Sequence, residues 1–227
     1  MNGTAARPRG AAVGRRIAVG LMYGLWQPRV LGAWRVPATG PAILAVNHSH
    51  NVDGPMLLGT SPRPVHFLVK KEAFVGPLGP FLRSIGQLSV DRHTADRAAT
   101  THALDVLAQG GLLGIFPEGT RGEGDFAALR GGLAYFALRS GAPIVPVAVL
   151  GSSERRSRLV GALPPLRGRV DVVFGEPFEA GDGAGRRTRK ALDAATRRIQ
   201  ERLTGHLAEA RALTGSRSTH LNGERAQ

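Results

Sequence analysis

The stretch AILAVNHSHNVDG at residues 42–54 joins a short apolar run to a polar loop. Residues 42–47 have turn residues on both sides, which is typical of a strand buried on both faces. The loop that follows holds His48 and Asp53, and α/β folds gather their chemistry in loops beyond the carboxyl ends of strands. This stretch therefore predicts both a buried parallel sheet and a candidate site at its edge.

The same alternation continues along the chain. Further buried strands are predicted at residues 65–69, 87–91, 112–116, 143–150 and 170–174. Helices are predicted around residues 56–58 and over 94–109, 127–140 and 186–213. Strands that alternate with helices indicate one α/β domain with a mixed, largely parallel sheet flanked by helices. Pro146 predicts that its strand lies at an edge of the sheet or carries a bulge.

Composition limits the chemistry that is available. The chain has 227 residues, 42% of them hydrophobic, which is enough for one domain with a substantial core. Cysteine is absent, so disulfides, thiolate nucleophiles and thiolate metal ligands are excluded. Nucleophilic or metal chemistry would have to use His, Asp, Glu, Ser or Thr.

The net charge of +13 is concentrated at the two ends of the chain. Residues 1–35 hold six arginines and no acidic residue, and residues 186–227 hold ten basic and four acidic residues. Basic ends suit an anionic surface, either phospholipid or nucleic acid. The alternative is that they only keep the protein soluble.

The segment nearest to a membrane span is residues 17–34, but Pro28 and Arg29 interrupt its apolar run. Trp26 and Trp34 flank one end, and tryptophan favours the headgroup level of a bilayer. We therefore expect an amphipathic, membrane-associating helical segment; the alternative is a core helix packed on the domain. The predicted organisation is a disordered basic tail (1–12), this helical segment (13–35), the folded domain (36–213) and a disordered tail (214–227).

The loop at residues 48–53 could carry general-base chemistry. Histidine accepts protons near neutral pH, and a carboxylate partner fixes its tautomer and stabilises the imidazolium. His48 and Asp53 could meet across one tight turn. The alternative is an ordinary polar loop with a helix-capping aspartate.

A second unusual loop is FPEGTR at residues 116–121. Pro117 ends the strand, Gly119 allows backbone to approach a ligand, and Arg121 can grip a phosphate with its fork of donors. Glu118 can accept hydrogen bonds from substrate hydroxyls. The alternative is a Pro-Gly turn with a surface ion pair.

Basic residues also follow two other predicted strands. Arg92 comes after residues 87–91, and Lys70 comes after residues 65–69. Each could meet a phosphate at the same edge of the sheet; each could equally be a solvated strand end.

Taken together, these motifs resemble the glycerolipid acyltransferase superfamily, and in particular the 1-acyl-sn-glycerol-3-phosphate acyltransferases. NHSHNVDGP (47–55) is similar to the family's His-x4-Asp motif, and FPEGTR to its glutamate motif. GQLSVDR (86–92) and APIVPVAV (142–149) resemble the remaining two motifs. All four stand in the family's order, and the resemblance covers roughly residues 40–180.

The resemblance implies the roles of the site residues. His48 would deprotonate the acceptor hydroxyl, and Asp53 would orient and charge His48. The acceptor would be held by Glu118, Gly119, Thr120, Arg121, Arg92 and Lys70, with the two arginines on its phosphate. No metal and no cofactor is implied.

The resemblance also implies the reaction and its setting. An acyl chain would pass from a thioester of coenzyme A or acyl carrier protein to a lysophospholipid hydroxyl, by direct attack without an acyl-enzyme. The default acceptor is 1-acyl-sn-glycerol-3-phosphate, which would give phosphatidate for phospholipid biosynthesis. The enzyme would sit on the cytoplasmic face of the cell membrane, with the phospholipid surface as a partner and no role for nucleic acid.

Two departures bear on the acceptor. The family often has Phe-Lys-x-Gly shortly after the glutamate motif, whereas this chain reads LRGG at 129–132. Arginine keeps the charge but is no simple substitute for lysine. Glu123 and Asp125 also place acids near the proposed phosphate site, so another lysolipid or a glycolipid remains open as the acceptor.

Three other functions fit parts of the sequence. A metal-dependent hydrolase would use His48, His50 and Asp53, but its His-x-His-x-Asp-His loop is not matched. A nucleic-acid binder would explain the basic charge but not His48, Asp53 or Glu118. A catalytically inactive, lipid-binding family member would be expected to lack motif residues that are present here.

Overall fold

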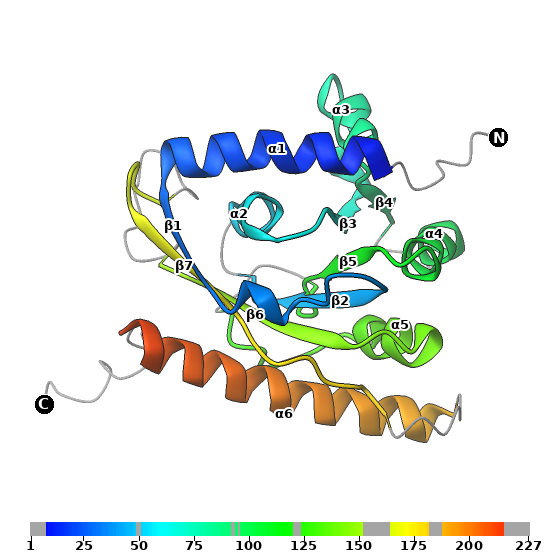
Figure 1. The fold of residues 1–227 in the computed structure, drawn as a ribbon. Coiled ribbons are helices and arrows are strands. Elements are labelled where there is room, and N and C mark those ends of the chain that lie inside the picture. Colours follow the sequence, from blue (N-terminus) through cyan, green and yellow to red (C-terminus); the bar gives the residue numbers. More distant parts are fainter. Residues whose placement is uncertain are drawn as a thin grey trace, which may run out of the picture.

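A computed structural model describes residues 8–48, 51–91, 94, 96–119, 124–151, 164–181 and 188–215. Within these residues a sheet of seven strands forms the middle layer and helices cover both of its faces (Figure 1). This confirms the predicted single α/β domain.

The sheet is mixed and largely parallel. Its spatial order is β1-β7-β6-β2-β5-β3-β4. Neighbouring strands pair in parallel except β6 and β7, which are antiparallel, so β1 and β7 run opposite to the other five. The strands are β1 (Gln27–Leu31), β2 (Ala42–Val46), β3 (Val65–Lys70), β4 (Leu88–Val90), β5 (Leu112–Ile115), β6 (Ile144–Leu150) and β7 (Arg169–Phe174).

Two of the helix ends carry residues that favour such ends. Asp96 caps α4 by accepting a hydrogen bond from the Ala99 N–H, and Gly141 ends α5 in the left-handed conformation. The α-helices are α1 (Pro8–Leu25), α2 (Asp53–Thr60), α3 (Leu78–Ser84), α4 (Arg97–Ala108), α5 (Gly132–Ser140) and α6 (Arg189–Thr214). Short 3-10 turns, η1 (Ala33–Arg35) and η2 (Lys71–Ala73), complete the set.

The central strands are apolar throughout because both of their faces are buried. All five residues of β2 are buried; Ile43 and Ala45 face one core, whereas Ala42, Leu44 and Val46 face the other. This alternation divides the interior into two hydrophobic layers.

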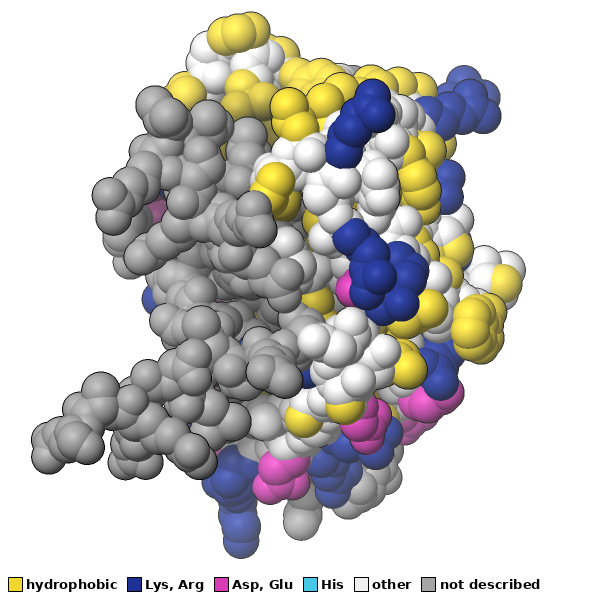
Figure 2. All heavy atoms as spheres, turned by 90° about the vertical axis from the view of Figure 1, so that its left-hand side faces the viewer, with side chains coloured by type: hydrophobic (Ala, Val, Ile, Leu, Met, Phe, Trp, Pro, Cys, Tyr) yellow, Lys and Arg dark blue, Asp and Glu magenta, His cyan; other side chains and the backbone are white. Residues whose placement is uncertain are grey.

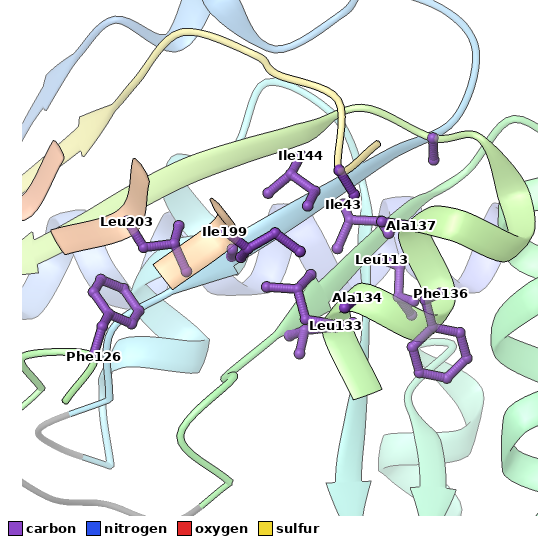
Figure 3. Packing of buried hydrophobic residues seen from close by; sticks show 14 of the residues in the cluster. Ile43, Leu113, Phe126, Leu133, Ala134, Phe136, Ala137, Ile144, Ile199 and Leu203 are labelled. Carbon is purple, nitrogen blue, oxygen red and sulfur yellow. The ribbon is translucent and has the colours of Figure 1, made fainter. Parts of the chain in front are cut away.

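One layer lies between the sheet and helices α4, α5 and α6. Figure 3 shows Ile199 and Leu203 of α6, Leu133 of α5 and Ile43 from the sheet together in this layer. Phe126, which precedes α5, is fully buried at the border of this layer although its φ is 60°. A bulky residue holds such a conformation only where packing compensates.

The other layer lies beneath α1 and α2. Met22 and Trp26 are buried in it, and α2 packs so closely under α1 that a Cβ on Gly59 would lie 2.9 Å from the Ala18 carbonyl oxygen. One face of α1 is therefore a wall of the core.

The N-terminal region differs from the predicted helical segment 13–35. The helix begins at Pro8 and ends at Leu25, and residues 27–31 form the edge strand β1. Pro28 is tolerated there because an edge strand can lack a donor on one side. Trp26 is also buried, with its indole N–H donating to the Pro164 carbonyl at 3.2 Å, whereas Trp34 is 81% exposed.

Pro146 lies in an internal strand, not at an edge. It sits where pairing on the β7 side is interrupted, between Val147, which pairs with Phe174, and an isolated bridge from Ile144 to Phe178. An interruption of the ladder accommodates the missing N–H.

Candidate active site

The two motif loops leave the sheet from adjacent strands. β2 and β5 pair in parallel, with Ala45 opposite Ile115, so the residues that follow each strand emerge side by side at one edge. Asn47 fixes the first loop: its side-chain amide donates to the Val149 carbonyl at 3.1 Å and accepts from the Val149 N–H at 2.7 Å. His48 therefore starts from a position tied to β6 as well as to β2.

His48 and Asp53 meet as the sequence predicts. His48 Nδ1 lies 3.2 Å from Asp53 Oδ2. The Asp53 side chain is fully buried at the start of α2, whereas that of His48 is 16% exposed. A carboxylate on Nδ1 favours the tautomer with the proton on that nitrogen, which leaves Nε2 to accept a proton from a substrate.

The imidazole is held from a second side by an aromatic stack. The ring centroids of His48 and Phe116 are 4.1 Å apart with an interplanar angle of 28°, and Phe116 in turn stacks on Phe67 at 5.4 Å. This contact joins the first residue of the FPEGTR motif to the general-base candidate. The sequence signalled Phe116 only as part of a motif, because a stacking partner cannot be inferred from spacing.

Glu118 lies against the same loop. Its carboxyl accepts hydrogen bonds from the main-chain N–H groups of His48 and Phe126, and its Oε1 atom is buried without a hydrogen-bond partner among the described residues. Burial raises the pKa of Glu118 to about 7, and the negative charges of Asp125 and Asp53 act in the same direction. The two main-chain hydrogen bonds lower the pKa in opposition.

Gly119 has a φ of 74°, a backbone conformation that favours glycine. The space that a side chain would fill at this position is taken by another residue. A Cβ there would collide with the side chain of Arg130, so the Arg130 guanidinium packs directly against the loop. The Arg130 main-chain N–H also donates to the Pro117 carbonyl at 2.8 Å. Arg130 belongs to the LRGG segment, which the sequence marked only as a departure from the family.

The remaining predicted residues are placed less fully. Lys70 ends β3 at the same edge of the sheet, with an exposed side chain. Its neighbour Lys71, not Lys70, pairs with Asp91 at 2.5 Å. Thr120, Arg121 and Arg92 lie outside the described residues.

Two features of the described part of the chain bear on the predicted setting. No helix there is long and apolar enough to cross a bilayer. No group of three or more His, Asp or Glu side chains there could hold a metal ion.

Comparison with known proteins identifies the class to which this fold and site belong. The sequence model of the acyltransferase family matches residues 27–150, which include both motif loops, and the chain therefore belongs to this family. More narrowly, it is an O-acyltransferase of the 1-acyl-sn-glycerol-3-phosphate acyltransferase type.

Individual relatives support this assignment. The chain is 30% identical over 177 residues to the 1-acyl-sn-glycerol-3-phosphate acyltransferase of Bacillus subtilis, covering 77% of this chain and 85% of that protein. It is 30% identical over 129 residues to the enzyme of the same name from Borreliella burgdorferi, covering 55% and 52%.

A solved structure supports the fold. The crystal structure of PlsC, the 1-acyl-sn-glycerophosphate acyltransferase of Thermotoga maritima, superposes with a TM-score of 0.65 at 23% identity. The match covers 90% of this chain and 79% of that one.

Proposed function

We propose that this acyltransferase moves a fatty acyl chain from a thioester to the free hydroxyl of 1-acyl-sn-glycerol-3-phosphate, giving phosphatidate for phospholipid biosynthesis. The observation that carries the proposal is the His48–Asp53 pair, 3.2 Å apart at the carboxyl edge of the sheet. The names of the two bacterial relatives support this acceptor over another lysolipid.

The chemistry follows from the free nitrogen of the imidazole. His48 Nε2 takes the proton of the acceptor hydroxyl as its oxygen attacks the thioester carbonyl carbon. The carbon–sulfur bond breaks, and the departing thiolate takes up the proton from the imidazolium. Asp53 stabilises the positive charge that His48 carries between these two transfers.

No acyl-enzyme is part of the proposal. The acceptor oxygen attacks directly, which suits a chain without cysteine. The donor is an acyl thioester of coenzyme A or of acyl carrier protein, and it acts as a co-substrate; the proposed reaction uses no cofactor and no metal.

Basic side chains would hold the acceptor's phosphate. Lys70 is exposed at the edge of the sheet where the catalytic loop emerges, and Arg121 and Arg92 are assigned to the phosphate from the family motifs. Glu118, Gly119 and Thr120 would border the glycerol part of the acceptor. The buried Oε1 of Glu118, which has no hydrogen-bond partner among the described residues, supports a polar contact there.

The proposed location is the cytoplasmic face of the cell membrane, bound peripherally. One face of α1 is exposed and carries Val13, Ile17 and Leu21, spaced four residues apart so that they form a stripe. Arg9 and Arg16 are exposed on the same helix, which has no acidic residue. Apolar side chains beside arginines favour an anionic lipid surface.

The reaction is tested by thiol release from palmitoyl-CoA, with and without 1-acyl-sn-glycerol-3-phosphate. We expect acceptor-dependent release by the wild type, and a loss of about 10²–10⁴-fold in kcat for His48→Ala because the general base is removed. His102→Ala on α4 is the matched control and should keep full activity. Release that His48→Ala leaves unchanged would rule out the mechanism.

A further inference from the structure

Besides the exposed apolar stripe on α1 (Val13, Ile17 and Leu21), a second exposed apolar segment lies at helix α3. Val75, Leu78 and Phe81 follow one another at intervals of three residues, and their exposed fractions are 65%, 48% and 41%. Leu78 and Phe81 are three residues apart within α3 (Leu78–Ser84) and so share one face of that helix, and Val75 lies just before it. The segment therefore presents an apolar ridge of its own.

The ridge adjoins α1. A Cβ added to Gly14 of α1 would lie 2.6 Å from the Cβ of Ile85, the residue that ends α3. Figure 1 shows α3 standing on the same outer side of the molecule as α1, above the amino-terminal half of that helix. The two elements thus form one surface.

Charge on this surface is mostly positive, with Lys70, Lys71 and one acidic residue, Glu72, exposed just before the segment. Residues 74–86 contain Arg83 and no acidic residue, and α1 contains three arginines and no acidic residue. The Arg83 guanidinium lies 5.3 Å from the Phe74 ring, beside the ridge. The opposite side of the molecule is different, because α6 carries both acidic and basic residues along its exposed face.

The space-filling view shows the same contrast. In Figure 2 hydrophobic side chains gather along the top of the molecule, where α1 lies, whereas acidic and basic side chains mingle at the bottom. An exposed apolar surface bordered mainly by basic side chains is complementary to a bilayer that contains anionic phospholipid.

We propose that the α3 ridge (Val75, Leu78 and Phe81) is a second bilayer-contact element, and that it fixes the orientation in which α1 lies on anionic membrane. A single helix contacts a plane along a line and leaves the protein free to roll about the helix axis. A second contact beside it removes that freedom. The inference rests on the proposed function for its lipid setting.

The orientation has a consequence for the site. Asp53 begins α2, and α2 packs directly beneath α1. Packed helices lie about 8–10 Å apart, so the catalytic pair is about one such layer below the membrane helix. A lysophospholipid can then stay among its neighbours in the bilayer while its headgroup reaches His48.

The test is co-sedimentation of the full chain with vesicles made of equal parts phosphatidylglycerol and phosphatidylcholine. We expect Leu78→Gln/Phe81→Gln to weaken binding about ten-fold, because two half-exposed apolar side chains no longer enter the lipid. The matched control, Tyr135→Gln/Leu138→Gln, changes two equally exposed side chains on α5 and should bind as the wild type does. All proteins carry His48→Ala, so binding is measured apart from turnover.

Several results would overturn the proposal. Unchanged binding of the α3 variant, or an equal loss in the α5 control, would show that the ridge does not contact lipid. A wild-type dimer in vesicle-free solution that the α3 variant converts to monomer would assign the ridge to a second copy of the chain. Melting temperatures equal to that of the wild type confirm that each variant is folded.

Failure of the ridge and failure of the proposed reaction give different results. If the ridge is wrong, the α3 variant with His48 restored still transfers acyl chains to vesicle-borne acceptor at the wild-type rate. If the reaction is wrong, vesicle binding persists and acceptor-dependent thiol release is absent even in detergent.

Discussion

The central strands begin at one border of the sheet, the amino edge, and end at the other, the carboxyl edge. Both edges hold buried or half-buried polar side chains, but these side chains make different kinds of contact. At the amino edge, Arg63 donates to the carbonyl oxygens of Pro37, Gly40 and Gly110 at 2.8, 2.9 and 2.5 Å. Pro37 and Gly40 lie just before β2 and Gly110 just before β5, while Arg63 itself lies just before β3. One guanidinium therefore joins the starts of three strands. Both terminal nitrogens of this side chain donate to main-chain carbonyl oxygens.

Other polar side chains at the amino edge are engaged in the same manner. Gln87 accepts from the Phe67 N–H and donates to the carbonyls of Val65 and Ile85. His66 Nδ1 bonds the Gly86 carbonyl at 2.7 Å, and burial lowers the pKa of His66. A hollow of about 220 Å³ lies beside Arg63 and His66, and both of these side chains are already bonded to main-chain carbonyl oxygens.

At the carboxyl edge, two titratable side chains face one another, although Asn47 and Glu118 there also bond to main chain. His48 pairs with Asp53, and Glu118 retains a buried oxygen without a described partner. The comparison teaches that the number of buried polar groups does not mark a site. Side chains whose hydrogen bonds are all made to main chain stabilise the fold, whereas a titratable pair, or a carboxyl oxygen without a described partner, is available for chemistry.

The largest effect that would test this contrast is on catalysis. Asp53→Asn should lower kcat for acyl transfer about 10²–10⁴-fold, because an amide cannot hold the His48 tautomer or stabilise the imidazolium. Thiol release under saturating acceptor measures it. Asp105→Asn, an exposed aspartate on α4, is the control, and an equal loss there would contradict the specific role of Asp53.

The amino edge should respond in stability and not in chemistry. Arg63→Ala should lower the free energy of unfolding by about 2–4 kcal/mol, because three carbonyl oxygens lose a charged donor. In a chain of this size that corresponds to a melting temperature lower by about 5–15 °C. Calorimetry measures the loss, and kcat of the folded fraction should stay at the wild-type value. A kcat that falls with stability unchanged would refute the division between the edges.

The smallest effect is a pH dependence of stability at the carboxyl edge. The pKa of Glu118 is about 7 in the folded protein and about 4.5 in an unfolded chain, so between these values only the unfolded chain releases the proton. The contribution of Glu118 to the free energy of unfolding is therefore fully present below pH 4.5 and is lost as the pH rises through 7.

Glu118→Gln removes that titration. Relative to the wild type, the variant should gain about 1–2 kcal/mol between pH 5 and pH 8, a figure reduced for the partial solvent exposure of Glu118. Melting temperatures of both proteins at the two pH values measure it, with Glu201→Gln on the exposed side of α6 as control. A difference that does not vary with pH would show that Glu118 is ionised throughout.

Sequence predicted most of the fold because the central strands are continuous apolar runs. Residues 65–69 and 112–116 were expected as strands, and β3 and β5 occupy Val65–Lys70 and Leu112–Ile115. β1 was missed because its strand character depends on β7, far along the chain. Arg29, which interrupted the apolar run, is matched by Asp171 at 2.7 Å, and no local pattern could reveal that pair.

The candidate site likewise has features that local sequence predicts and features that only the tertiary structure reveals. His48 and Asp53 were predicted to meet because one turn connects them. The clamp of Asn47 on Val149 and the burial of Glu118 depend on β6 and on the segment around Phe126, so they required the tertiary structure. α5 was expected from residue 127 but begins at Gly132, since the N–H of Arg130 bonds Pro117 instead.

The pairing of β1 with β7 also sets an order of events during synthesis. Arg29 and Asp171 are 142 residues apart, so β1 leaves the ribosome long before its partner exists. At 5–20 residues per second this interval lasts about 7–28 s. Throughout it, β1 has no strand to pair with and α1 is joined to a strand that cannot yet enter the sheet. The nascent helix is consequently available to a lipid surface before the enzyme that it belongs to has been completed.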